Sequence, residues 1–283
     1  MRFRRLFAAA QALVLGACAS MMSSAGAGLA DSVGSAMRNQ NDPEIVRDGA
    51  PAFLMMLDGF VEESPDDPEL LAAAADLYAS YGVVFVDQPE RARKLTSRGR
   101  AYGRRAVCAS QPAACGIWEL PYEEYLVDLE AFDRKDGAAM YTLVVSSLAY
   151  IRAHADDWKA VARLPDVTAT LRRLQALDPD YRTADVEHYL GVLNTFRPPA
   201  LGGDFEAGLR HFKRAVELAG DRDLSIKVDF ARYYARTLYE RELHDGLLTE
   251  VLEADAEVPG YVLSNTLAQS EASALLESAD DYF

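Results

Sequence analysis

From Asp42 onward, apolar side chains recur every three or four residues, which is the spacing of one face of an α-helix. Asp67 followed by Pro68 is typical of a helix N-cap and first helical position. The residues 81–86 and 141–148 resemble strands in composition, but each segment continues a helical stripe. The pattern therefore predicts an all-α protein. Its main stripes are Leu70, Ala74, Leu77, Tyr78, Tyr81 and Phe85; Tyr122, Tyr125, Leu126, Leu129 and Phe132; Val167, Leu171, Leu174 and Leu177; Phe205, Leu209, Phe212 and Val216; Val228, Ala231, Ala235 and Leu238; Leu247, Leu248, Val251 and Leu252; and Leu263, Leu267, Leu275 and Ala279.

Short breaks between these helices predict antiparallel pairs. Leu190-Gly191, followed by Gly208, Phe212 and Ala215, resembles the second half of a tetratricopeptide repeat. The connection is longer than that repeat allows, and the surplus falls at "FRPPALGG", residues 196–203. We expect degenerate tetratricopeptide-like hairpins that form one superhelical domain over residues 42–283, although generic helical pairs would give a similar pattern.

The N-terminus has the order of a secretory signal. Arginines among the first five residues precede an apolar run at residues 7–17, which is too short to span a bilayer. The end of the run, Leu15-Gly16-Ala17-Cys18, resembles the lipobox of bacterial lipoproteins, in which the cysteine carries lipid after cleavage. An ordinary signal with an incidental cysteine is the alternative. We expect a signal peptide at 1–17 and a lipidated flexible tether at 18–41. In lipoproteins of this type, an aspartate after the cysteine favours retention in the inner membrane, and here that position is Ala19. The resemblance therefore implies an outer-membrane anchor facing the periplasm.

The acidic composition limits the classes of partner that the protein can bind. The net charge is −15, from 29 basic and 44 acidic residues, and removal of residues 1–17 takes away three arginines and no acid, which leaves −18. A surface of this charge repels nucleic acid, so no nucleic-acid partner is expected. The lipid anchor is the expected contact with the membrane.

Two cysteines remain after the lipid site. Cys108 and Cys115 flank a turn that contains Pro112, and in an oxidising periplasm we expect them to form a disulfide. Two free, partly buried thiols are the alternative. Since no histidine lies nearby in sequence, a metal site is the poorest interpretation.

Four long segments together resemble the T component of tetratricopeptide-associated TRAP transporters, which are tripartite ATP-independent periplasmic transporters. The likeness runs from Asn41 to Phe283. It is carried by residues 41–82, 198–219, 231–255 and 275–283. The resemblance implies a periplasmic lipoprotein with a passage through each protomer, association with the transporter's substrate-binding protein, and a homo-oligomer, often a trimer. Binding of an apolar ligand is a further implication.

The interrupted repeat provides the candidate ligand- or partner-binding residues, because loops on a rigid scaffold often carry contacts. A plain repeat insertion is the alternative. In this loop Gly202-Gly203-Asp204 precedes a helix whose amides could hold an anion, but a turn with an Asp204 N-cap is favoured because the carboxylate would occupy those amides. The candidates are Tyr189, Phe196, Pro198, Pro199, Leu201, Gly202 and Gly203.

Catalysis finds no support in the motifs, and we expect no enzyme, no cofactor and no metal site. His154, His188, His211 and His244 show no metal-ligand spacing. His244-Asp245 resembles an acid/base pair, but neighbours on a helix diverge, so we interpret it as a solvated face. We expect most of the aromatic side chains near Tyr234 to be core, with a minority lining a channel.

The sequence thus favours an accessory component of a TRAP-type solute transport system. A tetratricopeptide lipoprotein scaffold for outer-membrane assembly is the first alternative, because it would share both lipobox and repeats. An enzyme acting on envelope material is the second, and convergent buried carboxylates or histidines would support it.

Overall fold

The computed structural model describes residues 26–197 and 202–283, so the expected signal peptide and Cys18 lie outside the described residues. These residues contain helices and turns and no strand, as the hydrophobic pattern predicted. A first helix covers residues 26–38. The others are α2 (Pro43–Glu63), α3 (Pro68–Val84), α4 (Pro89–Ser110), η1 (Pro112–Ala114), η2 (Ile117–Glu119), α5 (Tyr122–Asp128), η3 (Leu129–Ala131), η4 (Arg134–Asp136), α6 (Gly137–Ala153), α7 (Trp158–Val161), α8 (Leu164–Leu177), α9 (Thr183–Thr195), α10 (Phe205–Ala219), α11 (Ser225–Asp229), η6 (Phe230–Ala235), α12 (Arg241–Glu253), α13 (Val262–Glu277) and α14 (Ala279–Tyr282).

Helix starts follow local sequence. The Asp67 carboxylate accepts hydrogen bonds from the backbone N–H groups of Glu69 and Leu70, at 3.0 and 3.1 Å, and Pro68 occupies the first helical position. Asp42 and Pro43 begin α2 in the same way. Such a cap satisfies amides that have no partner within the helix.

The segment expected to be a flexible tether differs from that expectation. Residues 26–38 are helical, and Ala30 is buried in the first hydrophobic cluster together with apolar residues of α2, α3 and α4. Val33 and Met37 pack against the same cluster. The spacing of Ala30, Val33 and Met37 places these side chains on one helical face, and the burial of that face stabilises the helix.

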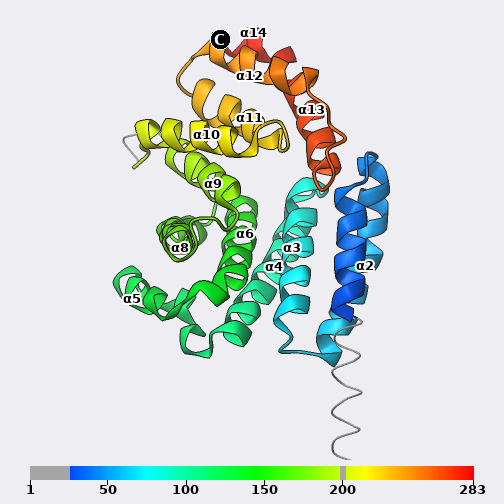
Figure 1. Cartoon of the computed structure of the whole chain (residues 1–283), viewed down its shortest axis with the longest axis vertical. Helices are drawn as coiled ribbons and strands as arrows, with labels where there is room; N and C mark the ends of the chain where they lie inside the picture. The colour runs from blue at the N-terminus through cyan, green and yellow to red at the C-terminus, as the bar shows by residue number, and fades with distance from the viewer. Residues whose placement is uncertain (1–25, 198–201) are drawn as a thin grey trace, which may run out of the picture.

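Two further hydrophobic clusters continue the chain. The second joins the end of α4 to α5, α6, α8 and α9, and the third joins α10, α11, η6, α12 and α13. The helices pack in sequential pairs, among which α3–α4 and α9–α10 make extensive contacts. In Figure 1 the N-terminal bundle, the green middle helices and the yellow-to-red C-terminal helices follow one another around an arc.

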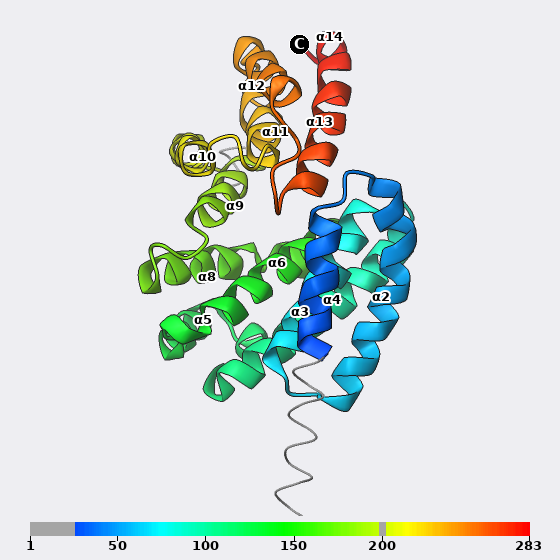
Figure 2. The same ribbon diagram turned by 45° about the vertical axis from the view of Figure 1, so that its right-hand side comes forward.

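The end of the arc returns to its beginning. Helix α13 contacts α2 and lies next to the N-terminal bundle in both views (Figures 1 and 2). The Gly260 N–H donates to the Asn39 side chain at 2.7 Å, and the Asn41 amide donates to Glu257 at 3.2 Å. Segments more than 200 positions apart in sequence therefore meet, since these pairs are separated by 221 and 216 positions.

Candidate functional site

A cavity of about 550 Å³ lies between α5, α8 and the end of α9. Helix α8 supplies one wall, because its lining residues recur at three- or four-residue spacing and share one face. The cavity is lined by Tyr122, Leu126, Leu129 and Glu130 from α5 and η3, by Pro165, Thr168, Ala169, Arg172, Arg173 and Ala176 from α8, and by Leu193, Asn194, Arg197 and Gly202.

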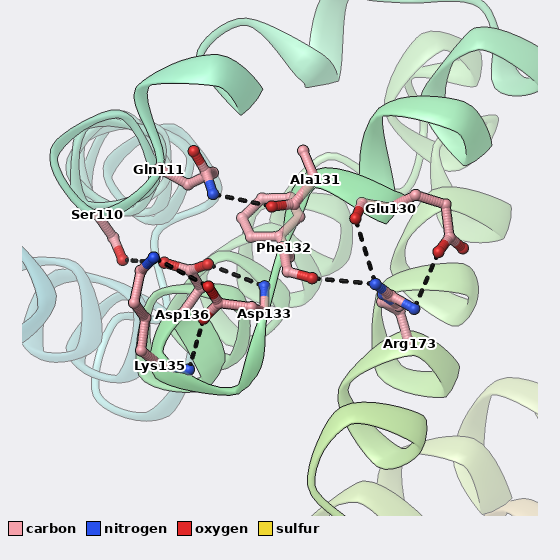
Figure 3. Close-up of polar contacts among 9 residues, drawn as sticks. All are labelled: Ser110, Gln111, Glu130, Ala131, Phe132, Asp133, Lys135, Asp136 and Arg173. Atoms are coloured by element: carbon pink, nitrogen blue, oxygen red, sulfur yellow. Dashed lines mark hydrogen bonds and ion pairs between the residues drawn. The ribbon is translucent and has the colours of Figure 1, made fainter.

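Arg173 fixes the wall opposite α8. Figure 3 shows its guanidinium reaching across to the η3 segment. The guanidinium donates to the carbonyl oxygen of Phe132 at 3.0 Å and to the carbonyl of Glu130 at 3.3 Å, and it forms an ion pair with the Glu130 carboxylate at 3.0 Å. Because one side chain satisfies two turn carbonyls and one charge, η3 is held at a set distance from α8.

Residues 131–136, which include η4, also form hydrogen bonds with the end of α4. The Gln111 amide donates to the Ala131 carbonyl at 2.8 Å, and the Ser110 hydroxyl donates to Asp136 at 2.8 Å (Figure 3). Asp136 is fully buried and also accepts the Asp133 backbone N–H at 3.0 Å. The hydrogen bonds from the Lys135 side chain and backbone lower the pKa of Asp133, so its carboxylate stays charged.

A disulfide joins Cys108 and Cys115 beside these contacts, with Cα atoms 4.5 Å apart. The structure therefore contains the bond that the sequence predicted. It ties the last turn of α4 to the chain that leads through η1 toward α5. The bond and the Gln111 and Arg173 contacts together support a rigid cavity wall.

The charge of the cavity lining is opposite in sign to that of the whole chain. The lining has three arginines and one glutamate, in a chain of net charge −15. The Nε atoms of Arg173 and Arg197 are buried and have no hydrogen-bond partner within the described ranges. The Arg172 side chain is exposed. The site thus combines a locally positive charge with the apolar surface of Tyr122 and Leu126, which are 41% and 36% exposed.

The structure places two of the seven candidate residues near this cavity. Gly202 lines it, and its φ of 88° is a left-handed conformation that favours glycine. Phe196 ends α9, is 36% exposed, and lies 5.1 Å from the guanidinium carbon of Arg197 measured to the ring centroid. Pro198, Pro199 and Leu201 lie outside the described residues.

Gly203 and Tyr189 have different surroundings. A Cβ on Gly203 would clash with the carbonyl of Arg197, so this glycine lets the chain pass close to the end of α9. The next residue, Asp204, caps α10 by accepting the Ala207 N–H at 2.9 Å, which confirms the turn-plus-cap interpretation. Tyr189 does not line the cavity; its ring stacks on His188, and burial raises its pKa.

Two of the four histidines form polar contacts between helices. His188 Nε2 lies 2.8 Å from Asp229, and His211 Nδ1 lies 2.6 Å from Glu187. The interpretation of His244 as part of a solvated face was wrong: its side chain is fully buried and packs against the Phe283 ring. In the described part of the chain, no group of three or more His, Cys, Asp or Glu residues is placed to hold a metal ion.

Sequence reasoning missed the arginines of the cavity. Arg172 and Arg173 lie beside the apolar stripe of α8, where basic residues ordinarily indicate a solvated face. Arg197 precedes Pro198 in the loop that was already a candidate, and its charge next to that loop was the available signal.

Comparisons with known proteins identify one family. A family model described as "TAtT: TRAP transporter T-component" matches residues 39–283, which include the cavity, the disulfide and the contacts that close the arc. No curated protein matches the chain. No described helix has the length and apolar character needed to cross a membrane.

Proposed function

The chain belongs to the TRAP transporter T-component family, and from this we propose that it is a lipid-anchored periplasmic accessory protein that binds the substrate-binding protein of its transporter. The family match carries the proposal because it spans nearly the whole described chain. The structure supports a binding role through a cavity of about 550 Å³, a volume within the range of small-molecule sites. This role is non-enzymatic: the protein positions or shelters a ligand for a partner.

The contact surface that we propose is the end of α9 and the loop that follows. Phe196 is partly exposed and its ring lies next to the guanidinium of Arg197, a residue that lines the cavity, and aromatic side chains are frequent anchors of protein interfaces. From the sequence we propose Pro198, Pro199, Leu201, Gly202 and Gly203 as the further contact residues. A partner that binds here would cover the cavity and control what enters it.

We propose that Cys18 carries the anchor and that the protein faces the periplasm from the outer membrane. The lipobox order at Leu15–Cys18 and the residue Ala19 support this location. Two or more acyl chains, each contributing about 0.8 kcal/mol per buried CH₂, would hold the protein stably. Association of several protomers, with a trimer expected from the family, would present several cavities to the partner. Sedimentation of the purified protein tests the trimer.

Fractionation and co-purification test this proposal together. Wild-type protein should sediment with outer membranes, and chemical crosslinking in cells should join it to the TRAP substrate-binding protein. A Cys18→Ser variant should shift to unprocessed or released forms. If the variant is processed and retained like wild type, the anchor assignment fails. If crosslinking recovers outer-membrane assembly proteins in place of the substrate-binding protein, the tetratricopeptide scaffold is the correct function.

A further inference from the structure

In the part of the chain that the structure describes, two of the three arginines that line the cavity have no opposing charge. The Glu130 carboxylate already pairs with Arg173 at 3.0 Å. Within the described ranges, neither Arg172 nor Arg197 has a carboxylate oxygen within 4.0 Å. Buried donors are normally satisfied, and the Nε of Arg197 is a buried donor with no partner in the described part of the chain. These two guanidinium groups therefore favour an anionic acceptor.

The rest of the lining favours a hydrocarbon. Tyr122 and Leu126 of α5 line one side of the cavity, and Ala169 and Ala176 of α8 line another. Leu129 and Leu193 also line it, but both are only 4% exposed because they belong to the hydrophobic core. Leu126 is 36% exposed, so its apolar surface is available for burial by a ligand. Burial contributes roughly 25 cal/mol for each Å² of apolar surface removed from water.

We propose that this cavity binds an anionic amphiphile, with its acidic head group at Arg172 and Arg197 and its hydrocarbon chain on Tyr122 and Leu126. This inference rests on the proposed function, because it names the class of ligand that the accessory protein shelters. A neutral hydrocarbon would leave both guanidinium groups without a counter-charge. A small inorganic anion would leave the apolar surface of Tyr122 and Leu126 exposed.

Arg173 has a separate role from the two head-group arginines. Its contacts with Glu130 and Phe132 hold the cavity wall, so its removal would change the shape of the site as well as its charge. The test therefore uses Arg172 and Arg197, whose neutralisation leaves that wall intact. Arg210 on α10 provides the matched control, because it is an exposed arginine that pairs with Glu206 and does not line the cavity.

Calorimetric titration of the purified mature protein tests the inference with defined probes. The probes are dodecanoate, dodecyl phosphate, methyl dodecanoate and inorganic phosphate, all kept below micelle-forming concentrations. We expect saturable binding of both anionic amphiphiles, and their relative affinities distinguish a carboxylate from a phosphate head group. Methyl dodecanoate should bind about tenfold more weakly, because it lacks the charge that strengthens hydrogen bonds to guanidinium groups.

Variants of the lining residues test whether dodecanoate binds in the cavity. Combined Arg172→Gln and Arg197→Gln changes should weaken dodecanoate binding about tenfold or more and remove its preference over methyl dodecanoate. Arg210→Gln should bind like wild type. Ala176→Phe fills the cavity from an exposed position on α8, so it should weaken the binding of both dodecanoate and methyl dodecanoate. The melting temperature should stay nearly unchanged.

Three results would overturn the inference: no saturable binding of either anionic amphiphile, equal affinity for dodecanoate and its methyl ester, or unchanged dodecanoate binding in the double variant. Binding of the substrate-binding protein is measured in parallel. If partner binding persists while dodecanoate fails to bind, the ligand class is wrong and the proposed function stands. If dodecanoate binds but the partner does not, the proposed function fails separately.

Discussion

Gly191 allows α9 and α10 to approach closely. A Cβ at this position would lie 2.9 Å from the Phe212 ring, which is fully buried between the two helices. On the opposite side of the contact, a Cβ at Gly208 would clash with the Thr195 side chain. Two glycines and one aromatic ring thus fix the spacing of this pair, and the same three residues are among those that carried its resemblance to a tetratricopeptide repeat.

A Gly191→Ala substitution should therefore lower the free energy of unfolding by about 1–3 kcal/mol, the usual cost of overpacking a close contact. Urea denaturation measures this change. Gly49→Ala on α2 is the control, because a Cβ there meets nothing within 4 Å. The control should stabilise the protein by about 0.4–1 kcal/mol. Equal stability of the two variants would show that the α9–α10 contact is looser than described.

Residue identity alone predicted some of these environments and not others. The spacing of Gly208, Phe212 and Ala215 falls within one helix, so the sequence reveals their shared face. The burial of His244 depends on Phe283, which returns to α12 from the end of the chain. The cavity arginines were missed for the same reason, since their surroundings come from α5, η3, α8 and α9, which are separate in sequence.

Among the elements, α9 is held by polar contacts with three neighbours. Glu187 accepts the Gln175 amide of α8 at 2.7 Å and contacts His211 of α10. The adjacent His188 contacts Asp229 of α11. These side chains are largely buried, so each contact links α9 to a different helix through a low-dielectric region.

The His188–Asp229 contact should make stability depend on pH. Burial lowers the pKa of His188, but the hydrogen bond and charge of Asp229 more than offset this effect, and the net result is a raised pKa. A raised pKa in the folded state stabilises the fold fully below the unfolded value, about 6.5, and this stabilisation is lost as pH rises through the folded value. We expect the free energy of unfolding to fall over that interval.

An Asp229→Asn variant should lose this part of the pH dependence, as measured by urea denaturation from pH 6 to pH 9. Asp221→Asn is the control, because Asp221 pairs with Lys227 and contacts no histidine in the structure. The Asp221→Asn variant should keep the wild-type slope of unfolding free energy against pH. Identical slopes for wild type and Asp229→Asn would show that the contact does not hold a proton on His188.

The disulfide between α4 and η1 should stabilise the protein by closing a short loop. With a sequence separation of 7, the chain-entropy effect is about 2–3 kcal/mol. Reductant should lower the free energy of unfolding of wild type by about that amount. A Cys108→Ser and Cys115→Ser double variant should start lower and be insensitive to reductant. Alkylation of both thiols in native protein without reductant would contradict the bond.

At the scale of the whole molecule, the helical pairs form an arc whose ends meet. The sequence predicted the all-α class because helical periodicity and Asp-Pro starts are local features. It did not reveal the contact of Asn39 with Gly260, because no local pattern records a pairing across 221 positions. The helix at residues 26–38 was missed because its small residues also suit a tether, and its burial requires α2 and α3 to be in place.

The direct test of the central claim is the affinity of the mature protein for its transporter's substrate-binding protein, measured by biolayer interferometry with a Phe196→Asp comparison. Wild type should bind saturably, and Phe196→Asp should weaken binding about tenfold or more, with helicity and melting temperature nearly unchanged. Trp158→Asp, at a side chain 82% exposed on α7, should bind like wild type. Absence of wild-type binding, undiminished binding by Phe196→Asp, or loss of folding in that variant would contradict the account.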